Sequence, residues 1–334
     1  MSSTTTSMDG ARLAGSTPDL KRRQRVGRLF SVLLLIATLI GLLMLVALIV
    51  DIAIEGLSWV RAPLFTNYHS RHPEQAGMKS AIVGSLIILG LTALFSFPLG
   101  VGAAVYLEEY APKGWLANLI NVNISNLAGV PSIVYGMLGL IVFGRMFGLF
   151  MPDSWLVGLL NLETGGRGGV QFHMLGLLIK LPFERSLLAG ALTMTLLILP
   201  IVIIAAREAI RAVPRSIRQA AYGLGATRWQ VVSRQVLPAA MPGILTGMIL
   251  ALSRAMGETA PLIIMGAFTY VPFLPKSVWD QFTVMPIQIY NWVTLPKEEY
   301  RVHLAGAGIL VLLAALLAMN GLTVYLRNRF EKRW

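Results

Sequence analysis

The sequence predicts an all-α integral membrane protein with six transmembrane helices and both termini in the cytoplasm. Of its 334 residues 55% are hydrophobic and only 13% are charged, whereas a soluble domain carries about 25% charged residues. The apolar residues fall into runs of about 20, long enough to cross a hydrocarbon core of about 30 Å as a helix. The absence of cysteine excludes disulfides, thiol catalysis and zinc–thiolate sites.

The first apolar run follows a basic tail. Residues 1–28 are polar and end in a cluster of lysine and arginine, which predicts a disordered cytoplasmic tail. The apolar run 29–50 is longer than the apolar part of a secretory signal, about 7–15 residues. We therefore interpret 29–53 as a retained first transmembrane helix.

The remaining spans form a core at 78–327, followed by a basic cytoplasmic tail at 328–334. Asn126, Pro131 and several glycines interrupt the third span, and such interruptions are tolerated where neighbouring helices cover the backbone. The five spans of this core are expected at 80–106, 124–147, 186–206, 242–268 and 304–326.

The distribution of charge predicts the orientation. The interval 207–234 contains six arginines and one acid, Glu208, whereas the loops on the other side each contain three basic and three acidic residues. Positive charge marks cytoplasmic loops, so both termini and the loop at 207–240 are expected in the cytoplasm. The short loop with Glu108, Glu109 and Lys113 is cytoplasmic only by alternation. The net charge of +12 thus reflects membrane orientation, and no nucleic acid is expected as a partner.

The loop at 207–240 is expected to form a helix, a turn and a second helix. Residues 215–222 and 226–236 have helical composition, and glycines 223 and 225 allow positive φ between them. Trp229, Val232 and Val236 would form an apolar stripe, and Pro238 and Pro242 are expected to end the second helix and begin the next span. Such a knob suits docking into a groove of another protein. The alternative is a basic loop that rests on anionic lipid.

The same stretch resembles the cytoplasmic "EAA" loop of ABC-importer permeases. Gln219 stands where that family has glutamate, and Gln235 where it has isoleucine. The matching residues are Ala220, Ala221, Gly225, Leu237 and Pro238. The resemblance implies that this loop, Gln219 included, couples the chain to a separate ATPase partner, which would hold ATP and magnesium.

The chain itself is not expected to be an enzyme or to hold a cofactor. A phosphate-binding P-loop needs lysine after glycine, and none of the seven lysines follows one. The stretch GGRGG at 165–169 is interpreted as a flexible linker. His69 and His72 make a poor metal site without a carboxylate cluster, and no nucleophile–base constellation is found. Arg207 and Glu208 are interpreted as an interfacial anchor, and Arg145 as a snorkelling residue.

Two charges stand within the fifth span. Arg254 lies about 12 residues beyond Pro242, about 18 Å along a helix, and Glu258 is four residues further, on the same helix face. They form either a structural ion pair or a site where Arg254 meets an anion that crosses the membrane. The planar guanidinium suits phosphate-like oxyanions. Pro261 removes the partner of the Gly257 carbonyl, which predicts a kink between Arg254 and Pro261.

The segment SRAMGETAPLI resembles the permeases of the phosphate-specific ABC importer. YLEEYAPKGWL (106–116), NLAGVPSIVYG (126–136) and the final YLRNRFEKRW fit the same group, and they are most similar to its A-type permease. The resemblance implies that Arg254, Gly257, Glu258 and Thr259 belong to the substrate pathway.

The resemblance also implies the rest of the transporter, in a bacterial inner membrane. The chain would pair with a sister permease of the C type, above two ATPase subunits and below a periplasmic phosphate-binding protein, surrounded by membrane lipid. It would import inorganic phosphate by alternating access. The alternatives are another oxyanion, such as sulfate or molybdate, and a signalling membrane protein whose loop contacts a sensor kinase.

Overall fold

The structure is a computed structural model that describes residues 18–112, 114–146, 164–165, 169–174, 177–181, 183, 185–267 and 270–330. Within these residues five helices are long and apolar enough to cross a membrane: Arg22–Trp59, Lys79–Tyr110, Leu187–Ala212, Arg228–Met256 and Glu299–Arg329. A pair bent by 103°, Trp115–Ala128 with Ser132–Gly144, makes up to six spans. The predicted all-α membrane fold is therefore confirmed.

Several of these spans are built from more than one regular segment. The long helices are α1 (Pro18–Gly56), α3 (Lys79–Val105), α4 (Trp115–Ala128), α7 (Leu187–Ala212), α10 (Leu237–Met256) and α13 (Ala305–Phe330). The shorter helices are α2 (Ala62–Thr66), α5 (Ser132–Gly139), α8 (Arg215–Gly223), α9 (Arg228–Val231), α11 (Ala260–Met265) and α12 (Met285–Thr294). Wide π-helical turns extend or join them at Tyr106–Tyr110, Leu140–Gly144, Val232–Val236 and Glu299–Leu304, and 3₁₀ turns lie at Leu57–Trp59 and Pro73–Gln75.

The chain divides into two units, Met1–Ile54 and Glu55–Trp334. The described part of the first unit is most of α1, whose apolar side chains are exposed along its length. An apolar helix with this exposure requires an apolar environment such as lipid. The helix begins at Pro18, so the basic cluster assigned to a disordered tail ending at 28 is helical instead. Residues 1–17 lie outside the described residues.

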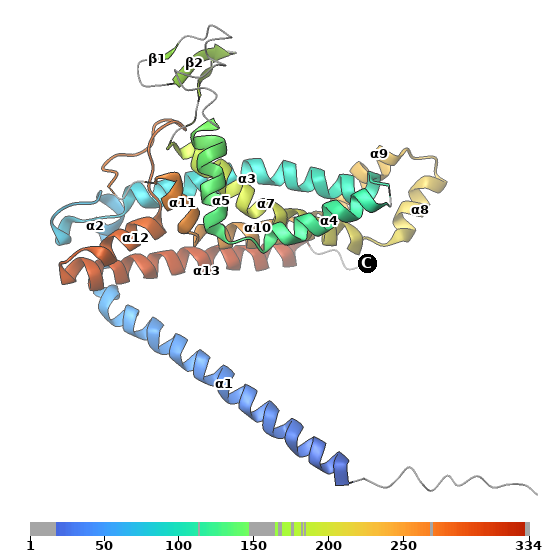
Figure 1. Ribbon diagram of the computed structural model, residues 1–334, viewed down its shortest axis with the longest axis horizontal. Helices are drawn as coiled ribbons and strands as arrows, with labels where there is room; N and C mark the ends of the chain where they lie inside the picture. The colour runs from blue at the N-terminus through green and yellow to red at the C-terminus, as the bar shows by residue number, and fades with distance from the viewer. Residues whose placement is uncertain are drawn as a thin grey trace, which may run out of the picture. The chain divides into compact units, whose positions relative to one another are not determined.

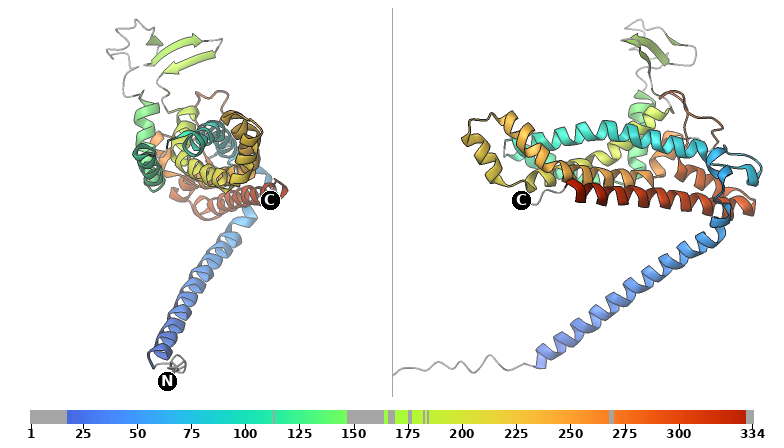
Figure 2. Two further views of the ribbon diagram at one scale, coloured as in Figure 1. Left: turned by 90° about the vertical axis from the view of Figure 1, so that its right-hand side faces the viewer. Right: turned by 180° about the vertical axis from the view of Figure 1, so that it is seen from behind.

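The second unit is a bundle centred on α7. Helix α7 packs against both α3 and α10, and α13 packs against α10. These four helices run alongside one another, with α8 and α9 at one end of the bundle and α2 and α12 at the other (Figures 1 and 2). The middle of α7 is buried through Met194, Ile198 and Val202, which makes it the best-covered of the candidate spans.

A small antiparallel sheet interrupts the helical pattern between α5 and α7. Its strands are β1 (Thr164–Gly165), β2 (Gly169–Met174) and β3 (Leu177–Leu181), in the order β1-β2-β3. Val170 pairs with Leu181 and Met174 with Leu177. The prediction of a flexible linker at 165–169 is wrong for Gly165 and Gly169, which pair with each other. Apolar residues alternate with polar ones in VQFHM, directly after the glycines, and this alternation is typical of a strand. The linker prediction considered only the glycines.

Two broken helices meet inside the bundle. The chain turns at Gly129–Pro131 between α4 and α5, and again at Gly257–Thr259 between α10 and α11. Helix α5 packs against α11, as Figure 1 shows. At this contact a Cβ atom added to Gly136 would lie 2.6 Å from the Cα of Pro261. The predicted kink before Pro261 is confirmed, in the stronger form of a complete break.

Gly136→Ala should lower the stability of the protein in detergent by about 1–3 kcal/mol, because the methyl group must separate two backbones. Gly102→Ala is the matched control. It lies within α3 with nothing within 4 Å of its added Cβ, so helix propensity should leave its stability equal or up to about 1 kcal/mol higher. Thermal denaturation of both variants checks the prediction, and equal midpoints would contradict it.

Candidate functional site

Arg254 lies where α10 ends. It belongs to the last turn of that helix, and Glu258 lies within the break that follows. The Arg254 Nε and Glu258 Oε1 atoms are 3.6 Å apart, and their side chains are 59% and 20% exposed. This is an ion pair too long to be a hydrogen bond. No other partner of the guanidinium is found among the described residues, so most of its donors are free to bind another anion.

Gly257 and Thr259 flank Glu258 within the break. A Cβ added to Gly257 would meet only the Arg254 carbonyl oxygen, at 3.7 Å, so the position opens onto free space. Thr259 is half-buried and precedes α11, and its side chain makes no cap bond there. The structure thus brings the four predicted pathway residues to one place. Arg254 is in the last turn of a helix that begins at Arg228, rather than at the middle of a span that begins near Pro242.

The predicted helix–turn–helix at 215–236 is confirmed. Helix α8 is followed by Gly225, whose φ of +79° is a conformation that favours glycine. Helix α9 begins with a capping box, in which the Thr227 hydroxyl accepts from the Gln230 N–H and the Gln230 side-chain oxygen accepts from the Thr227 N–H. These two devices fix the chain reversal that the sequence led us to expect.

The predicted end of the second helix at Pro238 is wrong. Helices α9 and α10 are joined by the π-helical turn Val232–Val236 and form one helix from Arg228 to Met256. The N–H of Leu237 reaches back to the Val232 carbonyl. This wide turn lies directly before Pro238, and a π-turn is one of the ways in which a helix accommodates a local disruption of its hydrogen bonds.

The residues that match the family loop divide between surface and core. Gln219, Ala220 and Pro238 are exposed, whereas Ala221 and Leu237 pack against an apolar cluster at this end of the bundle. That cluster unites the ends of α3 and α7 with the start of the Arg228–Met256 helix: Ala104, Ala206, Ile210, Val213, Val231, Val236, Ala240 and Ile244. It anchors the loop firmly to the bundle.

The predicted apolar stripe of the loop is only partly correct. Val232 and Val236 are fully buried, but the Trp229 side chain is 63% exposed. Leu224 and Tyr222 are exposed as well. Three large apolar side chains on one short loop form the kind of surface that binds another protein.

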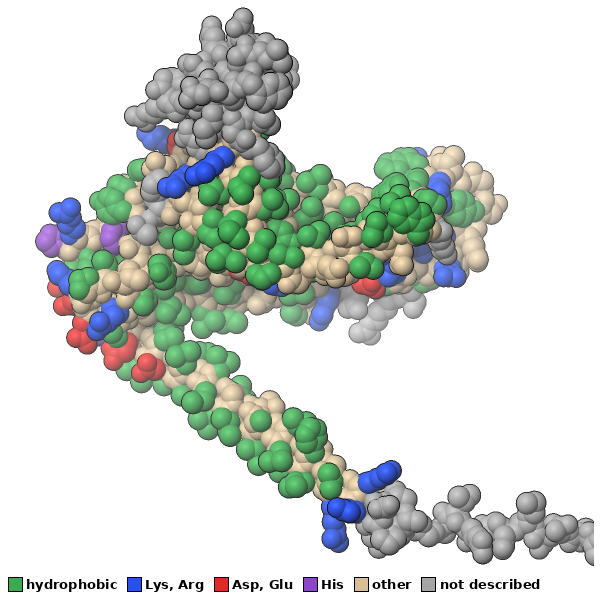
Figure 3. Space-filling model, viewed as in Figure 1, with side chains coloured by type: hydrophobic (Ala, Val, Ile, Leu, Met, Phe, Trp, Pro, Cys, Tyr) green, Lys and Arg blue, Asp and Glu red, His purple; other side chains and the backbone are tan. Residues whose placement is uncertain are grey.

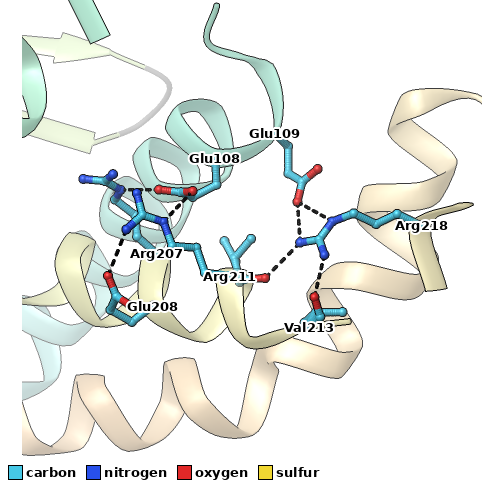
Figure 4. Close-up of polar contacts among 8 residues, drawn as sticks. Glu108, Glu109, Arg207, Glu208, Arg211, Val213 and Arg218 are labelled. Atoms are coloured by element: carbon cyan, nitrogen blue, oxygen red, sulfur yellow. Dashed lines mark hydrogen bonds and ion pairs between the residues drawn. The ribbon is translucent and has the colours of Figure 1, made fainter. Parts of the chain in front are cut away.

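Carboxylates at the end of the second span hold the arginine-rich segment. We call Glu108, Glu109, Arg207, Arg211 and Arg218 the acid–arginine cluster (Figure 4). Glu108 accepts from the Nε atoms of Arg207 and Arg211, at 2.6 and 2.8 Å. Arg211 also donates to Glu208 at 3.2 Å. One carboxylate therefore joins the π-helical turn after α3 to two successive turns of α7.

Arg218 connects the loop at 207–240, which we call the coupling loop after the role that the resemblance implies, to the same turn. Its Nη2 and Nε atoms donate to Glu109 Oε1 at 2.8 and 3.1 Å, and both side chains are mostly buried. Its Nη1 donates to the Val213 carbonyl at 2.6 Å and its Nη2 to the Ile210 carbonyl at 2.9 Å. Arg218 thus holds α8 against the end of α7 as well as against the end of α3.

This cluster corrects one interpretation from the sequence. Arg207 is a buried ion-pair partner rather than an interfacial anchor, with its side chain only 9% exposed. Glu108 and Glu109, placed in the cytoplasmic loop only by alternation, bind arginines of the basic interval 207–234. The sequence gives no local signal of these contacts, because the partners are 99 to 109 residues apart along the chain.

At the other end of the bundle, His69 is enclosed by aromatic side chains. The buried Trp292 donates its indole N–H to His69 Nδ1 at 3.0 Å. Gln288 Nε2 also lies 3.0 Å from that atom, and the ring contacts Tyr270 and Tyr300. Because an indole can only donate, Nδ1 must be unprotonated. Burial lowers the pKa of His69, which favours the same neutral form.

Comparison with known proteins identifies relatives of the whole bundle. The family model described as "Binding-protein-dependent transport system inner membrane component" matches residues 96–334. The phosphate transport system permease protein PstA of Yersinia pestis is 31% identical over 304 residues, which cover 90% of this chain and 88% of that protein. The probable ABC transporter permease protein YqgI of Bacillus subtilis is 31% identical over 261 residues, covering 78% and 76%.

More distant relatives share parts of the chain or the fold alone. The phosphate transport system permease protein PstC of Haemophilus influenzae is 31% identical over 230 residues, covering 68% of this chain and 69% of its own. A chain of a bacterial alginate ABC transporter, crystallised in complex with a periplasmic protein, superposes with a TM-score of 0.63. It is 18% identical and covers 94% of this chain and 97% of its own, a likeness of fold only.

Glu109→Gln should destabilise the protein by about 1–3 kcal/mol, because the buried Arg218 guanidinium loses its charged acceptor. Glu208→Gln is the matched control, since Glu208 is largely exposed and its surface pair should contribute at most about 1 kcal/mol. Thermal denaturation measures stability, and trypsin cleavage after Arg218 in α8 or Arg228 in α9 reports the loosening of the loop. If both variants denature and are cleaved alike, Glu109 does not anchor the loop.

Stability should also fall in acid because of His69. Its folded pKa is lowered, so below about pH 6.5 the unfolded chain takes up a proton that the folded state resists. The stabilisation is complete above that pH and is lost as the pH falls towards the folded pKa. His69→Gln should flatten this part of the stability–pH profile, whereas the exposed His72, changed to glutamine, should leave it unaltered. Parallel profiles for wild type and His69→Gln would contradict the assignment.

Proposed function

The chain belongs to the family of binding-protein-dependent transport system inner membrane components and is a permease of an ABC transporter; from that premise we propose that it serves an ATP-driven importer of inorganic phosphate. It would form half of the translocation pathway as the A-type permease, beside a sister permease of the C type. ATP hydrolysis would take place on separate ATPase subunits.

The observation that carries this proposal is the Arg254 guanidinium at the helix break. It is 59% exposed, and its one ionic partner among the described residues is 3.6 Å away. A charge in a span normally faces a wet cavity or the bundle interior, where it has a function. A planar fork of N–H donors fits a tetrahedral oxyanion. The names of relatives at 31% identity over most of the chain support phosphate as the cargo.

Glu258 gives the site a means of release. Its carboxylate, 3.6 Å from the Arg254 Nε atom, would compete with a bound anion for the positive charge of Arg254. Phosphate displaces the carboxylate, and the carboxylate displaces phosphate in turn. The open position at Gly257 leaves room for that exchange beside Thr259.

The coupling loop would bind the ATPase through its exposed apolar side chains. Trp229 and Leu224 are exposed on this loop, as are Gln219 and Ala220. ATP and magnesium would lie in the ATPase, whose closure would displace the loop and alternate the access of the pathway.

The apolar face of α4 and α5 is suited to lipid or the sister permease. Figure 3 shows hydrophobic side chains over these two helices. The exposed apolar residues there are Leu116, Leu119, Val122, Leu127, Ile133, Val134, Met137, Leu138 and Ile141. A periplasmic phosphate-binding protein would dock at the opposite end from the coupling loop.

Arg254→Met should reduce ATP-dependent uptake of radiolabelled phosphate at least about 100-fold, since charged hydrogen bonds to an oxyanion contribute about 1.5–3 kcal/mol each. Membrane vesicles would contain the chain with the products of the neighbouring genes, and sulfate and molybdate would be tested as competitors. Arg145→Met is the control, because it removes an exposed arginine at the end of the bent helix pair.

If Arg254→Met loses phosphate uptake and Arg145→Met keeps it, the result supports phosphate as the cargo and Arg254 as part of its pathway. Uptake at the wild-type rate in that variant would return Arg254 and Glu258 to a structural ion pair. Competition by sulfate or molybdate stronger than by unlabelled phosphate would assign another oxyanion as the cargo.

A further inference from the structure

A cavity lies beside the acid–arginine cluster, away from Arg254. It has a volume of about 450 Å³, within the range of small-molecule sites, and is enclosed by the end of the second span, the start of α4 and the end of α7. Its polar lining consists of Glu108, Trp115, Asn118, Asn121, Arg207 and Arg211. The coupling loop begins directly after α7, so the cavity and the loop are at the same end of the bundle.

The donors of Arg207 are incompletely used. A guanidinium carries five N–H groups, and Arg207 donates from Nε to Glu108. Its Nη1 and Nη2 atoms have no acceptor within the part of the chain that the structure describes, although the side chain is only 9% exposed. These two atoms are not themselves fully buried, so they are accessible to a ligand in the cavity that Arg207 lines. The cavity that Arg207 lines is the space in which an acceptor can be provided.

Arg211 adds a second donor set to the same cavity. Its Nε donates to Glu108 and its Nη1 to Glu208. The Nη2 atom has no acceptor among the described residues. Glu108 thus holds both guanidinium groups by their Nε edges. Two guanidinium groups and the Glu108 carboxylate line the cavity, whereas Glu208, which balances the second guanidinium, is largely exposed and screened by water. The charge that lines the cavity is therefore positive by one, which favours an anion.

The amide of Asn121 supplies a complementary group. Its Oδ1 atom is buried and has no hydrogen-bond partner among the described residues. It can accept from a hydroxyl group, and a singly protonated phosphate carries one. A ligand with several acceptor oxygens and one donor therefore satisfies both kinds of unpaired group.

We propose that this cavity binds a phosphate group through the guanidinium groups of Arg207 and Arg211. That group has two possible sources with the same chemistry. One is inorganic phosphate on its way out of the transporter, and this source rests on the proposed function. The other is the headgroup of an anionic phospholipid, because basic pockets between transmembrane helices bind such headgroups. The exposed Trp115 is a residue type enriched at the membrane surface.

The test is direct binding to the purified full-length chain with its co-purified partners, in a maltoside detergent free of phosphate. The probes are radiolabelled inorganic phosphate, by equilibrium dialysis, and short-chain phosphatidylglycerol, by native mass spectrometry. Ala117→Phe fills the cavity that Ala117 lines and removes no charge. Arg211→Gln removes one donor set. Arg215→Gln is the matched control, because it removes an exposed arginine of the same end that does not line the cavity.

We expect at least one probe to bind wild type and Arg215→Gln equally, and to bind Ala117→Phe and Arg211→Gln about tenfold more weakly or worse. Thermal denaturation verifies that both variants are folded. Binding of free phosphate identifies an exit site, and binding of the lipid alone identifies a headgroup site. The proposal is overturned if neither probe binds, or if binding survives unchanged in both cavity variants. If phosphate binding is lost in Arg254→Met but kept in Ala117→Phe, the phosphate binds in the pathway and not in this cavity. That result would overturn this proposal and leave the proposed function intact.

Discussion

The bundle depends on one constraint, that a backbone N–H or C=O group in lipid must find its partner within the protein. Long helices satisfy this requirement by themselves, because each N–H binds a carbonyl of the same helix. The two breaks, at Gly129–Pro131 and Gly257–Thr259, are costly by the same rule. They are tolerable because the short helices that follow them, α5 and α11, pack against each other. The backbones approach closely at Gly136 and Pro261, where any larger side chain would hold them apart.

A second balance operates at the coupling-loop end, between burial of charge and burial of apolar surface. Taking a carboxylate and a guanidinium out of water is unfavourable unless their hydrogen bonds are satisfied. Arg218 meets that condition, with bonds to Glu109 and to two carbonyls that end α7. The adjacent apolar cluster around Val231 and Val236 adds hydrophobic stabilisation. The hydrophobic effect favours burial but does not set a particular orientation. The hydrogen bonds of Arg218 therefore determine the orientation of α8, and apolar burial stabilises its attachment to the bundle.

The sequence predicted the features that have a one-dimensional signal. Runs of apolar residues located the helices, Gly225 and the amphipathic segments located the loop, and Pro261 located the break. What it did not predict depends on contacts between distant segments. Nothing local in the stretch around Glu108 reveals that it binds Arg207, 99 residues away along the chain. The continuation of the helix through Pro238 was also missed, because a π-helical turn has no composition of its own.

That continuous helix bears directly on how a permease of this family can work. Arg228–Met256 is 29 residues long, about 43 Å at 1.5 Å per residue. Its first turns belong to the coupling loop, with Trp229 exposed, and its last turn carries Arg254. A helix interrupted at Pro238 would absorb a displacement of the loop at the interruption. An unbroken one carries that displacement along its axis to the break at Gly257–Thr259, where the chain can bend. One helix therefore connects the loop to Arg254, and a displacement of the loop would be expected to change the distance between Arg254 and Glu258 at the break.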